Sequence, residues 1–194
     1  YPKIQRRVSG YNLDEFAGDG PLNLARMIVG SEGTLAFVTS ARVRLEPLPV
    51  LRGLAAVHFR SVADACGAVL PALTHAPAAV ELADATIIER CRESIGFRSL
   101  VEFVIGDPGG LLLIELFDDD ASRLQARLGA LARDLEGRAA AYGAHITVDP
   151  AEQLRIWRMR EAGLGILMSV KGDAKPVALV EDTAVPPERL AEWV

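Results

Sequence analysis

The sequence has few cysteines, few aromatic residues and no long hydrophobic run. Cys66 and Cys91 are its two cysteines, and they form no C-x-x-C pair that could begin a zinc or iron–sulfur site. We interpret both as reduced thiols in the core of a cytosolic protein. The apolar stretches are far shorter than the roughly 20 residues that cross a bilayer, so we expect no transmembrane segment. We expect a cytoplasmic location, with peripheral attachment to the inner membrane left open.

An excess of basic residues is also lacking. The 21 Lys and Arg residues against 26 Asp and Glu give a formal net charge of -5, whereas domains that bind nucleic acids are normally basic. The three histidines, His58, His75 and His145, are scattered and share no metal-ligand spacing. We therefore expect no nucleic-acid partner and no metal site, and we interpret the histidines as structural.

What the chain does have is apolar content for a sizeable core, with 50% hydrophobic residues. The two prolines of Glu46-Pro47-Leu48-Pro49 end any strand and favour an extended linker. We place a domain boundary there, which separates residues 1–49 from residues 50–194. In the first segment, residues 22–29 indicate a short helix or turn. Residues 35–45 alternate apolar and polar side chains, which predicts a strand.

The second segment alternates strands with helices. The order β-α-β-(α)-β-α-β predicts an α+β fold, a ferredoxin-like antiparallel sheet with helices on one of its faces. A leucine stripe with helical spacing marks the longest helix, which we expect to end near Ala141. The predicted strands are 51–59, 78–83, 111–117 and 145–148, and the predicted helices are 62–73, 85–95, 121–141 and one that begins at Asp149-Pro150.

A polar loop with two glycines, Gly30 to Thr34, lies directly before the first predicted strand. Glycine permits positive φ and close backbone approach, and consecutive free amides can bind an anion such as a phosphate. The loop is neither a P-loop nor the G-x-G-x-x-G turn that opens a helix. Taken alone, these five residues are more typical of a plain glycine-rich turn.

Segments at both ends of the chain resemble the FAD-linked D-2-hydroxy-acid dehydrogenases of the vanillyl-alcohol-oxidase type, which include D-lactate, glycolate and D-2-hydroxyglutarate enzymes. Gly10 to Leu13 and Val29 to Leu35 are similar to the family elements G-Y-x-L and V-G-S-E-G-T-L. Leu154 to Glu161 is similar to the helix L-W-x-x-R-E, and Val180 to Pro186 to the segment D-[VTL]-[SA]-[VL]-P. The middle of the chain matches by architecture, since the family's substrate domain is ferredoxin-like.

The resemblance implies a fragment of a larger flavoprotein oxidoreductase. Residues 1–49 would be the C-terminal part of an FAD-binding domain, and residues 50–194 a truncated substrate (cap) domain of the FAD-linked oxidase C-terminal type. The full-length parent would take a hydride from a D-2-hydroxy acid to FAD, with its electron acceptor left open. The residues that the resemblance implies at the cofactor are Gly30, Ser31, Glu32, Gly33, Thr34, Ala36 and Val38, where Ala36 departs from the usual glycine.

Lys171 to Pro176 is similar to the large family members that carry an iron–sulfur half, so a cluster in a missing C-terminal region is a further expectation. The family's catalytic histidine and metal ligands lie in a segment that this chain does not contain. We therefore assign no catalytic residue here, and we expect the isolated chain neither to bind FAD tightly nor to turn over.

Arg160 is the first residue that we expect to bind substrate. It shares a predicted helical face with Ile156, Gly163 and Leu164, which predicts that it is buried, and a buried guanidinium needs a carboxylate or an equivalent partner. The pattern alone favours a protein acid or solvent, whereas the resemblance implies the substrate carboxylate. Lys175 is the second expected substrate residue, for which a solvated loop lysine is the alternative.

A function of a different class is also compatible with the predicted architecture. Ferredoxin-like folds host many unrelated functions. The alternative to a flavoenzyme is a ferredoxin-like module that binds a small ligand or a partner and has no redox activity.

Overall fold

The computed structural model describes residues 10–18, 20–168, 172–173 and 184–194. The chain divides into two compact units: Tyr1–Pro47 with Ala178–Pro186, and Leu48–Val177 with Pro187–Val194. The chain first passes from one unit to the other between Pro47 and Leu48. No helix of the described residues has the length and apolar character needed to span a membrane.

The first unit contains a 3₁₀ helix, η1 (Leu13–Phe16), and a short helix, α1 (Leu24–Ile28), as expected for 22–29. Asn23 caps α1, since its side-chain oxygen accepts the amide of Ala25 at 3.1 Å. The side-chain amide of Asn12 donates to the carbonyl oxygens of Arg26 and Val29 at 3.2 and 3.1 Å. The polar side chain of Asn12 therefore ties the segment before η1 to the end of α1.

The strand predicted for residues 35–45 does not form, so that prediction was wrong. Within the described part of the chain, residues 36–49 belong to no helix or strand. Phe37 is 93% exposed and Leu45 84% exposed. Alternation favours an extended backbone, but a strand also needs a neighbour for its amides and a surface for its apolar face.

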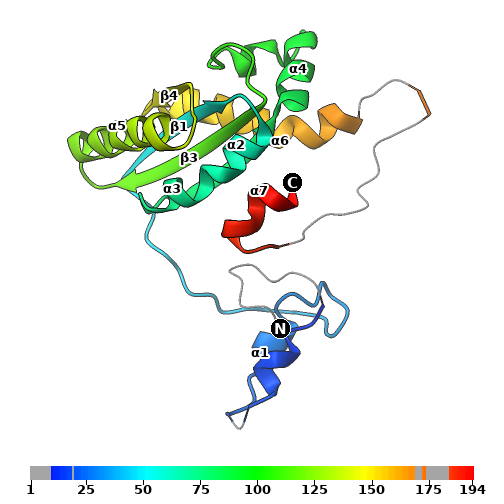
Figure 1. Cartoon of the computed structure of the whole chain (residues 1–194). Coiled ribbons are helices and arrows are strands. Elements are labelled where there is room, and N and C mark those ends of the chain that lie inside the picture. The colour runs from blue at the N-terminus through cyan, green and yellow to red at the C-terminus, as the bar shows by residue number, and fades with distance from the viewer. Residues whose placement is uncertain (1–9, 19, 169–171, 174–183) are drawn as a thin grey trace. The chain divides into compact units, whose positions relative to one another are not determined.

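The second unit is built on a four-stranded antiparallel sheet with the order β2-β3-β1-β4 (Figure 1). The central pair is in register with Ala56 of β1 opposite Leu113 of β3, and Ala56 also faces His145 of β4. This confirms the predicted α+β fold with an antiparallel sheet. The strands are β1 (Leu51–Phe59), β2 (Ala79–Asp84), β3 (Gly110–Asp118) and β4 (Gly143–Thr147).

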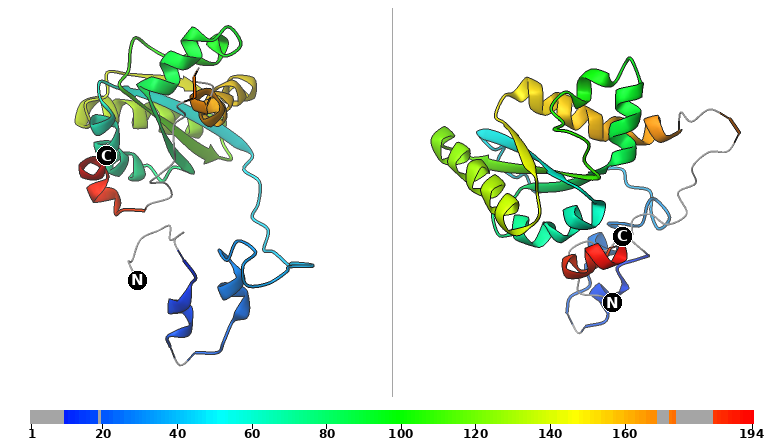
Figure 2. Two further views of the ribbon diagram at one scale, coloured as in Figure 1. Left: turned by 90° about the vertical axis from the view of Figure 1, so that its right-hand side faces the viewer. Right: turned by 45° about the horizontal axis from the view of Figure 1, so that its top comes forward.

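Helices cover both faces of this sheet, whereas the prediction placed them on one face. Successive residues of β1 point to opposite sides, so Ala55 and Val57 join one core cluster while Leu54 and Ala56 join the other. A strand buried on both faces is apolar at consecutive positions. Figure 2 shows the two layers: α2 (Val62–Gly67), α3 (Val69–Leu73) and α5 (Ala121–Arg138) on one face, and α4 (Ala85–Glu93), η2 (Arg98–Val101) and α6 (Pro150–Met168) on the other.

Two helices differ from their predicted extents. The helix predicted over 62–73 is divided at Ala68, because Pro71 has no amide to donate to the carbonyl of the preceding turn. The helix predicted to reach Ala141 ends at Arg138. There Ala140 adopts a left-handed conformation with φ 57°, and the amides of Ala139 and Ala141 both donate to Leu135. The predicted leucine stripe is confirmed as buried: Leu124, Leu128, Leu131 and Leu135.

Candidate functional site

The residues expected to contact FAD form a tight turn in the first unit. Gly30 and Gly33 have φ values of 80° and 75°, and Glu32 between them has φ 50°. These are left-handed conformations that glycine adopts at little cost and that other residues adopt rarely. The two glycines therefore have a conformational reason for their positions.

Hydrogen bonds close this turn from within. The hydroxyl of Thr34 donates to the carbonyl of Ser31 at 2.6 Å, and the amide of Thr34 donates to the same oxygen at 2.9 Å. The Tyr11 hydroxyl lies 2.8 Å from the Thr34 hydroxyl. Ser31 is 4% exposed. The turn thus has a defined shape, and the Gly-Tyr segment contributes to it directly.

The turn presents backbone amides that an anion could use. Among the described residues, no backbone oxygen accepts the amides of Glu32 and Gly33. No atom lies within 4 Å of where a Cβ on Gly33 would be. Neighbouring amides without acceptors in left-handed turns form a concave site for anions. The turn therefore fits a phosphate group, while Ala36 and Val38 follow it in a segment that belongs to no helix or strand.

Arg160 is exposed, in contrast to the predicted burial. Its side chain is 47% exposed, whereas Ile156 and Met159 are 1% and 0% exposed and take the inward positions of α6. The Arg160 Nε donates to Glu81 Oε2 on β2 at 3.0 Å. The guanidinium therefore has the protein acid that the pattern alone favoured.

Polar side chains of the sheet and of α6 also come together at Trp157, three positions before Arg160. Burial raises the pKa of Glu115 on β3, and the charge of Arg52 and the indole N–H of Trp157 on α6 oppose this rise.

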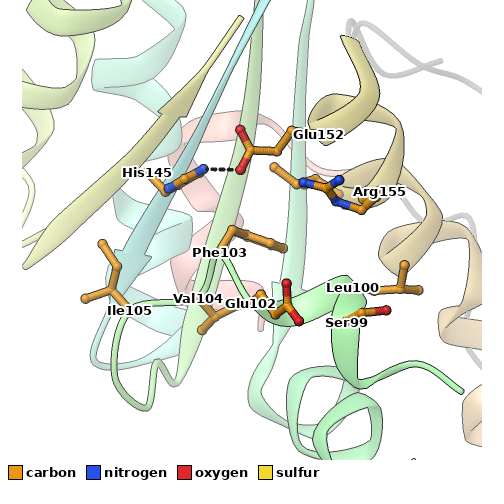
Figure 3. Close-up of a pocket in the computed structure, with 10 residues that line it drawn as sticks. Ser99, Leu100, Glu102, Phe103, Val104, Ile105, His145, Glu152 and Arg155 are labelled. Carbon is orange, nitrogen blue, oxygen red and sulfur yellow. Dashed lines mark hydrogen bonds and ion pairs between the residues drawn. The ribbon is translucent and has the colours of Figure 1, made fainter. Parts of the chain in front are cut away.

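A separate cleft of about 300 Å³ lies between α6 and the segment that includes η2 (Figure 3). His145 Nε2 lies 3.0 Å from Glu152 Oε1. Hydrogen bonds from Thr147 and His145 lower the pKa of Glu152, and the charge of Arg155 adds to this effect. Sequence reasoning did not identify this cleft, because its residues form no motif: Ser99, Leu100, Glu102, Phe103, Val104, Ile105, His145, Glu152, Arg155 and Ile156.

His58 is the most buried of the histidines, and its structural interpretation is confirmed. Its Nε2 accepts the amide of Ile105 at 3.1 Å, so Nδ1 carries the proton and donates to the Gly143 carbonyl at 3.2 Å. Burial lowers the pKa of His58, which keeps the ring neutral. His75 is instead partly buried, with its side chain 21% exposed, and its Nε2 lies 2.9 Å from Asp134 Oδ2.

The two cysteines, possible metal ligands and Lys175 are the remaining groups that the sequence analysis considered. Cys66 and Cys91 are free and buried, which confirms them as core thiols, and burial raises the pKa of each. In residues 10–18, 20–168, 172–173 and 184–194, no three His, Cys, Asp or Glu side chains converge as a metal site would require. Lys175 lies outside the described residues.

Comparison with known proteins gives a consistent set of relatives. The family model for FAD linked oxidases, C-terminal domain, matches residues 48–194. The D-2-hydroxyglutarate dehydrogenases of Pantoea ananatis and Escherichia coli are each 34% identical over 100% of the chain. A D-lactate dehydrogenase of Archaeoglobus fulgidus is 29% identical over 96% of the chain and 38% of its own length. The chain spans 20% of the length of the two D-2-hydroxyglutarate dehydrogenases.

Proposed function

Because the chain belongs to the family of FAD-linked oxidases, C-terminal domain, we propose that its parent protein is a flavin-dependent oxidoreductase of D-2-hydroxy acids. One observation carries this proposal: the match to D-2-hydroxyglutarate dehydrogenases extends over the whole chain at 34% identity. Hydroxyglutarate and lactate share a carboxylate beside the carbon that bears the hydroxyl. We therefore propose that class as the substrate and leave its side chain open.

We assign the first unit to the end of an FAD-binding domain and the second to the substrate domain. The Gly30–Thr34 turn would hold the diphosphate, since its positive-φ backbone offers the amides of Glu32 and Gly33. Ala36 and Val38 would follow along the cofactor. Bound FAD would supply the acceptor for the hydride that leaves the α-carbon. No residue of this chain is assigned to the electron acceptor or to an iron–sulfur cluster.

Arg160 is the proposed clamp for the substrate carboxylate. A guanidinium binds a carboxylate through two parallel hydrogen bonds, which sets orientation as well as affinity. Its Nε is bonded to Glu81, so the two outer nitrogens are the donors we assign to substrate. Orienting the α-carbon in this way is a large part of what a protein contributes to such a reaction. Lys175 is proposed as a second cation at the substrate.

The test uses the full-length protein purified with its flavin. D-2-Hydroxyglutarate, D-lactate and glycolate, together with the L enantiomers of the two chiral acids, are added anaerobically while the absorbance of the oxidised flavin is recorded. We expect a D-2-hydroxy acid to bleach the flavin and its L enantiomer to leave it oxidised. A protein that carries no flavin, or a flavin that none of these acids reduces, would favour a binding module without redox activity.

A further inference from the structure

We propose that Glu81 is a positioning residue that orients the guanidinium of Arg160 for the substrate carboxylate. The inference rests on the proposed role of Arg160 as the clamp. Glu81 is 79 residues from Arg160 in the chain, and the two side chains meet through an Nε to Oε2 hydrogen bond of 3.0 Å. Sequence motifs gave no reason to connect them.

Glu81 is bonded to the Nε atom of the Arg160 guanidinium, away from its two terminal nitrogens. Among the described residues, Glu81 is the single hydrogen-bond partner of Arg160, and it accepts from Nε. The edge that carries the two terminal nitrogens can pair bidentately with a carboxylate without involving Nε. A carboxylate held on Nε restricts rotation of the plane and leaves that edge available.

The elements that carry the two residues are themselves fixed. Ile156 and Met159 anchor α6 in the core, and Trp157 packs against the same core cluster. Glu81 lies within β2, opposite Leu113 of β3. Since both backbones are held, the remaining freedom lies in the long side chain of Arg160, which is what Glu81 restrains.

Stability does not account for this ion pair. The side chains of Arg160 and Glu81 are 47% and 41% exposed, and ion pairs at such positions add little to the free energy of unfolding. Ordering a long side chain at the moment of binding weakens affinity by about 2- to 13-fold. A guanidinium that is already oriented avoids this loss, so the contact has its effect on substrate binding.

The test compares Glu81→Gln, Glu81→Asp and Glu136→Gln in the full-length flavoprotein, with D-2-hydroxyglutarate as the probe. Glu81→Gln should raise KM about 2- to 13-fold with little change in kcat, because the ordering loss affects substrate and transition state alike. Glu81→Asp keeps the charge on a shorter side chain and should recover part of the loss. Glu136 is exposed on α5, so Glu136→Gln removes the same charge and should leave KM unchanged.

A double-mutant cycle distinguishes the positioning role of Glu81 from the proposed role of Arg160 as the substrate clamp. In the Arg160→Lys background, Glu81→Gln should cause no further rise in KM, since lysine has no planar fork to orient. An equal rise in that background, or no rise in the wild-type background, would overturn the positioning role. A fall in KM on Glu81→Gln would overturn it as well, because Glu81 would then compete with substrate for Arg160. Full activity in Arg160→Lys alone would instead refute the clamp.

Discussion

Replacing Arg160 by lysine tests the central assignment in this chain. Lysine keeps the positive charge but offers a single nitrogen, which cannot bond Glu81 and both oxygens of a carboxylate in one plane. At least one charge-assisted hydrogen bond is lost, and such bonds contribute about 1.5–3 kcal/mol. Because about 1.4 kcal/mol corresponds to a tenfold change in an equilibrium or rate constant, kcat/KM should fall by about 10- to 150-fold.

Because Arg160 is partly exposed, we expect a fall in kcat/KM in the lower part of this range. The Arg160 side chain is 47% exposed in this chain, and solvent screens interactions at such positions. We expect a loss of about 10- to 30-fold in kcat/KM for a D-2-hydroxy acid. The assay is steady-state dye reduction by the full-length protein, with flavin content measured on every preparation.

Arg158 provides the matched control, because it is an exposed arginine two positions away on the same helix. Arg158→Ala should keep its activity, and both variants should keep their flavin, since these residues belong to the second unit. Full activity in Arg160→Lys together with loss of activity in Arg158→Ala would refute the assignment of the clamp.

Three further predictions concern the second unit. Leu128→Ala removes a side chain that is 0% exposed and should lower the free energy of unfolding by about 2–5 kcal/mol. Leu154→Ala, at a 52% exposed position, should have little effect on it. Urea titrations measure both variants. Gly109→Ala would place a Cβ 2.3 Å from a backbone oxygen and should lower the free energy of unfolding by about 1–3 kcal/mol. Gly137→Ala places its Cβ with nothing within 4 Å and should not lower the stability. Melting temperatures compare the two variants. His58 has a lowered pKa when folded, so the unfolded chain binds the extra proton below about pH 6.5 and stability falls as the pH decreases through that region. Urea midpoints across that pH range measure the slope, which His58→Gln should flatten.

Local patterns were sufficient for most of the second unit. Strand and helix positions followed from periodicity, because a buried strand and an amphipathic helix leave different spacings in the sequence. The leucine stripe of α5 is an example, since its burial depends on one helical face. Boundaries were less accurate where a backbone conformation decided them, as at Ala140 with its φ of 57°.

The strand predicted at 35–45 does not form, which shows what the alternation of side chains alone cannot predict. Alternation describes one chain segment, whereas strand formation depends on neighbours that the described residues do not supply. The apolar runs of β1 and β3 did contain the signal for two covered faces. The prediction nevertheless placed the helices on one face, and the helix layers on both sides became evident only in the folded sheet.

The sequence by itself determined the α+β class, the glycine turn and the helix that carries Arg160, because each depends on residues close together in the chain. Only the tertiary structure decided the surroundings of that arginine. Its exposure follows from how α6 is rotated against the sheet, and its partner Glu81 comes from a strand 79 residues away. Contacts across such separations depend on the packing of whole elements, which no local spacing encodes.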